Sequence, residues 1–230
     1  MKFQLKLKSM SVTVGAIMCF GSAQAALFDR GGGLIYDDDL NVTWLQDANY
    51  AKTSSYDADG LLPWTAAVAW ADNLVYGGYS DWRLPTTTDV GNDGCSVFST
   101  SGGTDCGLKP DPNTSEMAHI FYVTLGNKGT PDADAGVKNP GPFLNLTGHE
   151  GYWSGTADVS NPTVSAWAFG SDGSQPGHQD THLQSIPLNA WAVRSGDIAA
   201  AIPEPETYAM LLAGLGLLGF MARRRKVSTI

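Results

Sequence analysis

Carboxylates in turn-rich segments are the first candidates for chemistry in this 230-residue sequence. Three consecutive aspartates, Asp37, Asp38 and Asp39, and the segment 57–60 (DADG) supply the hard oxygen ligands that Ca²⁺ prefers. Neither group continues into a twelve-residue loop with a terminal glutamate, and aspartate and glycine are also ordinary turn residues. Two interpretations therefore stay open: a calcium site at Asp37 to Asp39, or solvated turns without any cofactor.

Histidines are the second kind of candidate ligand. Glu116 and His119 stand three apart in an expected helix, as in helical di-metal carboxylate sites. Those sites need several carboxylates, however, and the sequence has one such pair. His178 and His182 lie in a segment rich in glycine, proline and aspartate, where weak metal binding and plain solvation are both open.

Catalytic motifs are missing from the sequence. It contains no G-x-S-x-G, H-E-x-x-H or P-loop pattern. A glycan hydrolase would need two carboxylates at a fixed separation, and the many aspartates here do not single out a pair. The sequence therefore favours a non-catalytic protein over an enzyme.

The stretch DWRLPT places a scarce cation, Arg83, between two apolar residues. In an extended segment Asp81 and Arg83 share one face while Trp82 faces the other way, and Pro85 prevents a helix from following. A guanidinium in this setting can bind a carboxylate at two points and stack on an aromatic ring. We expect Asp81, Trp82 and Arg83 to support the fold rather than to form a site.

The chain ends carry targeting signals. Residues 1–25 combine early lysines, an apolar run over 12–20 and an A-x-A sequence ending at Ala25, which predicts a signal peptide removed by signal peptidase. Near the other end, a PEP tripeptide precedes an apolar segment (207–222) and a basic cluster. The basic cluster predicts transient anchoring in the inner membrane with the domain outside.

The tail over 203–226 resembles a PEP-CTERM sorting signal. The residues that carry the resemblance are Pro203, Glu204, Pro205, Arg223, Arg224 and Arg225. The resemblance implies an exosortase as processing partner, in a Gram-negative bacterium that makes an exopolysaccharide matrix. An ordinary C-terminal anchor is the alternative, because sixteen apolar residues are short for a membrane span.

Charge and cysteine content agree with an exported domain. Residues 26–206 contain 23 acidic and 7 basic side chains, a net charge of −16, which excludes nucleic acid as a partner. Two cysteines, Cys95 and Cys106, remain after the signal peptide is removed. In an oxidising compartment they predict one disulfide, and closing so short a loop contributes roughly 3 kcal/mol.

The periodicity of the sequence predicts an α+β fold with a single domain. Helices are expected over 64–76 and 115–125, the second capped by Asn113 and ended by Gly126. Strands are expected at 33–37, 41–47, 143–147, 151–156, 165–173 and 189–197. The last three predict a twisted antiparallel meander with GSDGSQ as a hairpin loop.

Several blocks in order resemble the Lcl C-terminal domain family. They are GLIYDDDLNVTWLQDANYA, GGYSDWRLPT, SEMAHIFYVTLG, YWSGT, AWAF and AWAVR, which together extend over about residues 31–197 of a domain at 26–200. The resemblance implies a C-type-lectin-like fold and an adhesin role. The glycosaminoglycan ligand of that family is not carried over, because this domain is strongly acidic and lacks a collagen-like stalk.

These observations predict an exported surface or matrix protein that binds an extracellular polysaccharide. An enzyme acting on matrix glycans and a purely structural matrix protein are the alternatives. The expected contacts are in the second half, with Asp37 to Asp39 added if calcium takes part. The residues selected there are Trp167, Asp172 and His178.

Overall fold

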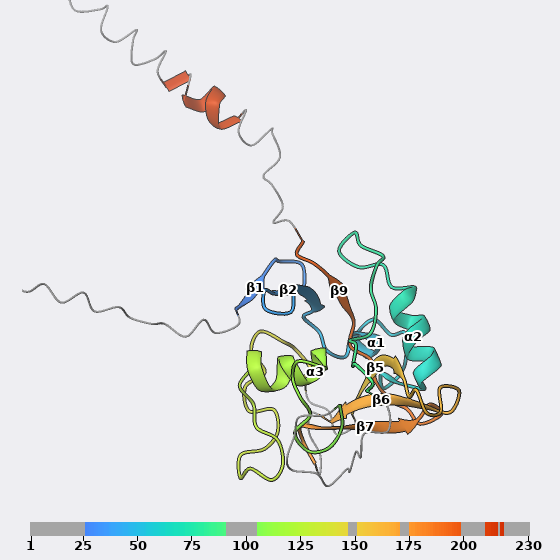
Figure 1. Ribbon diagram of the computed structural model, residues 1–230. Coiled ribbons are helices and arrows are strands. Elements are labelled where there is room, and N and C mark those ends of the chain that lie inside the picture. Colours follow the sequence, from blue (N-terminus) through green and yellow to red (C-terminus); the bar gives the residue numbers. More distant parts are fainter. Residues whose placement is uncertain are drawn as a thin grey trace, which may run out of the picture.

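The computed structural model describes residues 26–90, 105–146, 151–170, 175–198, 210–215 and 217–218. The predicted signal peptide, Cys95, Asp172 and the tail residues at 203–205 and 223–225 lie outside these ranges. The described part of the domain holds two sheets and a few short helices, which confirms the predicted α+β class (Figure 1).

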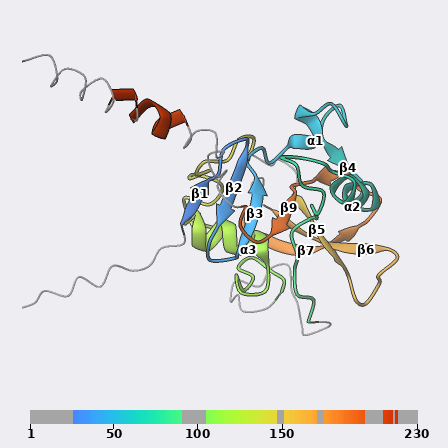
Figure 2. The ribbon, with the colours of Figure 1, turned by 90° about the horizontal axis from the view of Figure 1, so that it is seen from above.

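The first sheet joins the beginning of the domain to its end. It has the order β1-β2-β3-β9, and every neighbouring pair is antiparallel. Its strands are β1 Leu27–Asp29, β2 Leu34–Asp37, β3 Val42–Leu45 and β9 Val193–Ser195. Figure 2 shows β9 beside β3, although the two strands are far apart along the chain.

The second sheet is mixed and has the order β4-β8-β5-β6-β7. Its strands are β4 Leu61–Leu62, β5 Tyr152–Ala157, β6 Ser165–Gly170, β7 His178–Leu183 and β8 Leu188–Asn189. β5 and β8 are parallel, and the other pairs are antiparallel. The antiparallel run β5-β6-β7 confirms a meander, but its third strand is β7, in a segment for which the sequence predicted a loop.

The segment 189–197 does not join that meander. It divides between β8 and β9, so the chain passes from the second sheet to the first through buried Ala190, Trp191 and Ala192. The described part of the expected strand at 143–147, residues 143–146, is also not a strand. Leu144 exchanges single backbone hydrogen bonds with Gln46 and Ala48 at 2.8 and 2.9 Å, which is one isolated bridge.

The first predicted helix is shorter than expected. α2 extends over Trp64–Asp72 rather than to Tyr76. The Asn73 side chain donates to the Ala69 carbonyl at 2.7 Å, and Tyr76 and Tyr79 then exchange backbone hydrogen bonds across a turn. Gly77 and Gly78 occupy that turn with positive φ, which other residues rarely adopt.

The second predicted helix begins and continues differently. α3 (Glu116–His119) is capped by Ser115, whose hydroxyl accepts the Ala118 N–H at 3.1 Å. The predicted cap Asn113 instead donates to Asp111. The chain then widens into the π-helix η1 (Ile120–Thr124), and a further turn, α1, covers Tyr50–Thr53.

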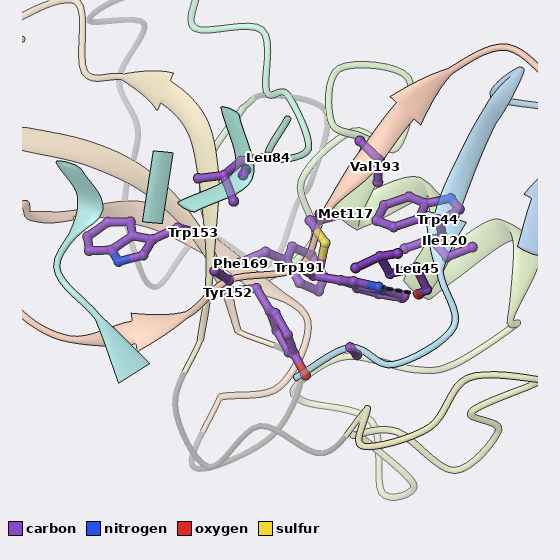
Figure 3. Close-up of a cluster of buried hydrophobic side chains, with 14 of the residues drawn as sticks. Trp44, Leu45, Leu84, Met117, Ile120, Tyr152, Trp153, Phe169, Trp191 and Val193 are labelled. Carbon is purple, nitrogen blue, oxygen red and sulfur yellow. Dashed lines mark hydrogen bonds between the residues drawn. The ribbon is translucent and has the colours of Figure 1, made fainter. Parts of the chain in front are cut away.

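The core includes three fully buried indole rings, those of Trp44, Trp153 and Trp191 (Figure 3). Trp44 and Trp191 lie 4.5 Å apart between ring centroids, and Phe143 meets Trp191 edge-on at 4.8 Å. Trp191 donates to the Leu45 carbonyl at 2.7 Å, and Trp153 donates to the Leu62 carbonyl at 2.8 Å. Trp153 and Trp191 therefore keep their polar atom satisfied, whereas Nε1 of Trp44, which is also fully buried, has no hydrogen-bond partner among the described residues.

The DWRLPT stretch lies against β9. The backbone of Arg83 exchanges two 2.8 Å hydrogen bonds with Val193, and Trp82 and Leu84 are buried. The Arg83 guanidinium binds both carboxylate oxygens of Glu116 at 2.7 Å. Asp81 binds Arg194 at two points, each 2.9 Å long.

Candidate ligand-binding site

An opening in the described surface lies beside η1. It is a pocket of about 500 Å³ between the loop that follows Cys106 and the segment that follows η1. Its lining combines apolar and charged groups: Lys109, Pro110, Asp111, Pro112, Tyr122, Asn127, Lys128 and Asp132. We call it the Tyr122 pocket.

Two glycines, Gly129 and Gly177, leave the space that the Tyr122 hydroxyl occupies. Its hydroxyl donates to the Gly177 carbonyl at 2.6 Å and lies 3.0 Å from the Leu108 carbonyl. A Cβ atom on Gly129 or Gly177 would come within 2.1 or 2.2 Å of that hydroxyl. Because the hydroxyl is fixed among backbone groups, the ring is a rigid apolar wall for anything in the pocket.

Burial also keeps this phenol neutral. Desolvation raises the pKa of Tyr122, and the nearby Asp132 carboxylate raises it further. Tyr122 is therefore a hydrogen-bond donor and a packing surface at every physiological pH, rather than a base or a nucleophile.

The charged residues of the pocket form loose pairs. The Lys109 ammonium lies 3.5 Å from Asp132, and the Lys128 ammonium lies 3.7 Å from Asp134. Asn127, in contrast, is part of the scaffold, because its amide holds the backbone of Lys138 and Asn139. The two ammonium groups and the carboxylates beside them can exchange these partners for a ligand at little cost.

The sequence did not single out this pocket. One signal was present: three of the four lysines in residues 26–206 fall between positions 109 and 138. In a domain of such negative charge that concentration is unusual. Their grouping around one opening depends on the fold of the loops, which periodicity does not reveal.

The residues predicted to bind a ligand are distributed differently. Trp167 is only 4% exposed, and its indole donates to Asp89 at 2.9 Å, so it belongs to the packed interior. His178 begins β7, directly after the Gly177 that holds Tyr122. Asp172 lies outside the described residues.

The three consecutive aspartates point to three different partners. Asp37 is fully buried, and its carboxylate accepts the backbone N–H of Asp39 and Leu40 and the hydroxyl of Thr124 at 3.1 to 3.2 Å. Burial raises the pKa of the Asp37 carboxyl, although these hydrogen bonds oppose the effect. Asp38 accepts the backbone N–H of Ala26 at 2.8 Å.

The third aspartate, Asp39, lies 2.8 Å from Nε2 of His119, which leaves the predicted Glu116 and His119 pair divided. Glu116 is bound to Arg83 instead. No group of three His, Cys, Asp or Glu side chains is arranged to hold a metal ion in the described part of the chain. Calcium binding by Asp37 to Asp39 stays a prediction.

Of the two cysteines of the predicted disulfide, the structure describes Cys106 alone. Cys106 is 1% exposed, and its predicted partner, Cys95, lies outside the ranges that the structure describes. The pairing of the two cysteines stays a prediction.

Comparison with known proteins identifies the tail of the chain. Residues 201–226 match the family model of the PEP-CTERM protein-sorting motif. No curated protein and no solved structure matches the chain. The resemblance of the folded domain to the Lcl C-terminal family, and with it a lectin-like fold, therefore stays a prediction.

The sorting motif indicates where the protein is located. Of the described residues, those at 210–215 and 217–218 form a short exposed helix, and no helix in the described ranges is long and apolar enough to cross a membrane. The predicted span at 207–222 stays a prediction. The motif indicates an exported protein that an exosortase processes, placed at the surface or outside a Gram-negative bacterium.

Proposed function

We propose that this exported protein binds an extracellular polysaccharide without altering it, and that one sugar unit occupies the Tyr122 pocket. The observation that carries the proposal is the lining of the pocket. It brings ammonium donors and carboxylate acceptors around rigid apolar surfaces in one opening of about 500 Å³.

The chemistry of a sugar ring suits that lining. Each hydroxyl both donates and accepts hydrogen bonds, so a site with Lys109, Lys128, Asp111 and Asp132 can satisfy several hydroxyls in turn. The apolar edges of the ring can lie against Pro110, Pro112 and the fixed Tyr122 ring. Apolar walls with a few convergent polar groups are typical of small-molecule sites.

The charges of the pocket and of the whole domain limit which class of polysaccharide can bind. Two lysines and two aspartates line the pocket, so its local charge balances, whereas residues 26–206 carry a net charge of −16. A neutral polysaccharide meets no repulsion from the surrounding surface. An acidic polysaccharide would need divalent cations as a bridge. Of the predicted calcium residues Asp37 to Asp39, the exposed Asp38 and Asp39 could contribute to that bridge, whereas Asp37 is fully buried.

The setting of the protein supports the same conclusion. The sorting motif supports export in an organism with an extracellular matrix, and the resemblance to the Lcl C-terminal family, with its adhesin member, supports surface binding. Signal peptidase would remove residues 1–25, and the segment 207–222 would anchor the chain briefly before exosortase processing.

A matrix pull-down with matched variants tests the binding proposal. We expect the secreted protein to be retained by host matrix polysaccharide, and retention to fall at least tenfold in Lys109→Ala/Lys128→Ala. Lys52→Ala is the control, because Lys52 is an exposed lysine on α1 that does not line the pocket.

Each run is repeated with calcium and with a chelator. Neutral glycans should bind under both conditions, and acidic glycans only with calcium. Equal retention of the double variant and the parent would refute the pocket assignment. Release of shortened polymer during incubation would establish an enzyme instead.

Intact-mass measurement of the surface-released protein tests the processing steps. We expect a mass that lacks residues 1–25 and the segment from 207 onward. A released form that retains residues 207–230 would contradict exosortase cleavage while leaving the binding test unaffected.

A further inference from the structure

Strand β7 presents three polar side chains on one face. His178, Asp180 and His182 alternate with Gln179 and Thr181, and alternate residues of a strand point to the same side of the sheet. β7 pairs only with β6 among the named strands and forms one edge of its sheet. The face is therefore a polar, half-buried strip on the edge strand of this sheet, whose outer side is bridged at Gln179 by Gly107.

The neighbouring strand carries only small residues beside this strip. His178 is paired with Gly170, Asp180 with Ala168 and His182 with Ala166. Residues in register on adjacent strands point to the same face, so the three polar side chains stand beside positions with small or absent side chains. The imidazoles can therefore lean along the sheet toward each other.

His178 is seated in one orientation. A Cβ atom on residue 170 would lie 2.5 Å from its Nδ1, so only glycine leaves space for the ring. Nδ1 lies 2.6 Å from the Gln175 carbonyl oxygen, and since a carbonyl only accepts, Nδ1 carries the proton. In the neutral imidazole the lone pair that can bind a metal ion is then on Nε2.

This is the arrangement that metal-binding histidines adopt. A ligating imidazole commonly donates its second N–H to a backbone carbonyl, which fixes both its tautomer and its direction. Asp180 is oriented in a similar way, because its carboxylate accepts the Thr181 N–H at 2.7 Å.

The separation of the two rings is close to that of a chelate. The ring centroids of His178 and His182 are 6.4 Å apart. Two imidazoles on one ion, with metal–nitrogen bonds of about 2.0–2.1 Å, have centroids roughly 5–6 Å apart. A small rotation of the side chains closes the difference.

We propose that His178 and His182 chelate a divalent transition-metal ion at the edge of β7 as its two protein ligands, with water in the remaining positions. Asp180 lies between them in sequence as a nearby carboxylate and not as a third ligand, because the described side chains form no three-residue metal group. Imidazole ligands favour zinc, copper and nickel over calcium and magnesium. The site is separate from the Tyr122 pocket and does not depend on the proposed polysaccharide.

Zinc titration of the metal-free secreted protein by isothermal calorimetry tests the inference. We expect one zinc ion per chain, at least tenfold weaker binding in His178→Ala and in His182→Ala, and a smaller loss in Asp180→Asn. His119→Gln is the matched control, because His119 is bound to Asp39 and is not part of β7, so the change should leave the affinity unchanged.

Gly170→Ala provides a second measurement, since it removes no ligand but displaces the seat of His178. We expect several-fold weaker zinc binding with an unchanged circular dichroism spectrum. Zinc binding that persists in His178→Ala/His182→Ala, or its absence in the folded parent up to millimolar zinc, would overturn the proposal.

Discussion

The arginines and the lysines of the folded domain carry the same charge but hold different positions. Arg30, Arg83 and Arg194 each bind a carboxylate at two points, with contacts of 2.7 to 2.9 Å. The pocket lysines, Lys109 and Lys128, reach theirs at a single point, 3.5 and 3.7 Å away. Their side chains are 41% and 58% exposed, against 12% to 31% for the arginines.

The difference follows from the shape of the two cations. A guanidinium is a planar fork that matches both oxygens of a carboxylate, whereas an ammonium on a flexible stem is a hydrated point charge. The arginines accordingly tie distant segments together: Arg30 to Asp197 spans 167 residues and Arg194 to Asp81 spans 113. The lysines stay available to a ligand. In this domain the three arginines stabilise the fold, whereas the two pocket lysines remain available at the candidate site.

Replacement of Arg83 should have the largest effect of any charge change. Arg83→Ala leaves Glu116, whose side chain is only 14% exposed, without its partner, and we expect a loss of roughly 2–3 kcal/mol in the free energy of unfolding. Arg83→Lys should restore less than half of that loss, because an ammonium cannot form the two parallel hydrogen bonds. Urea denaturation measures both variants. A fully stable Arg83→Ala variant that no longer binds matrix would make Arg83 part of a site.

Arg194→Lys should cost less, about 1 kcal/mol. The guanidinium lies 4.1 Å from the centroid of the Tyr79 ring and binds Asp81 at two points, and lysine can keep only part of either contact. The loss should shrink on acidification, because Arg194 lowers the pKa of Asp81 and this contribution disappears as Asp81 is protonated. A loss that is equally large in acid would mean that packing on Tyr79 is the whole effect.

Asp37 extends the comparison to a buried carboxyl group whose hydrogen-bond partners in the described structure include no arginine. Burial raises its carboxyl pKa in the folded state, so its contribution to stability is greatest in acid and is lost as the pH rises through that folded pKa. Asp37→Asn should therefore be more stable than the parent at neutral pH, with the advantage vanishing toward pH 3. Thermal unfolding across this range measures the difference. A variant that is less stable at every pH would show that the charge itself holds the Asp39 and Leu40 turn.

The smallest effect is expected at the pocket. Lys109→Gln should change the free energy of unfolding by no more than about 0.5 kcal/mol, since exposed single-point pairs contribute little. Thermal unfolding in low and high salt checks this. A loss comparable to that of Arg83→Ala would mean that the pocket lysines are structural and that the division between the two cations does not hold.

The sequence predicted a strand correctly where the residues of that strand alone were enough to determine it. β2, β3, β5 and β6 each contain aromatic residues, which are typical of strands, and the expected strands overlap all four. β7 was not predicted, because its sequence HQDTHL has no alternation of apolar and polar residues. Its pairing with β6 is what makes it a strand. The sequence predicted one strand at 189–197 where the structure has β8 and β9, because no local pattern shows where the chain leaves one sheet for the other.

The sites were harder to predict for a related reason. The prediction at Arg83 depended on its immediate neighbours, and the structure places its guanidinium on a carboxylate, Glu116, that the sequence linked to a different role. The Tyr122 pocket depends on loops more than 50 residues apart, with Gly177 reaching back to Tyr122. Trp167 was chosen as an aromatic in a strand, but burial depends on which face is covered, and the sequence does not show this.

The position of β9 has a consequence for when the domain can form. β3 has β2 on one side and β9 on the other, and the Thr43 hydroxyl donates to the Gly196 carbonyl across 153 residues. Contacts so distant along the chain slow folding, because a long loop must close before they are made. The first sheet is therefore incomplete until nearly the whole domain has been translocated, and folding should reach its end only as the sorting tail arrives. A chain stalled during export would present the unpaired edge of β3, an exposed template for aggregation, until its own last strand covers it.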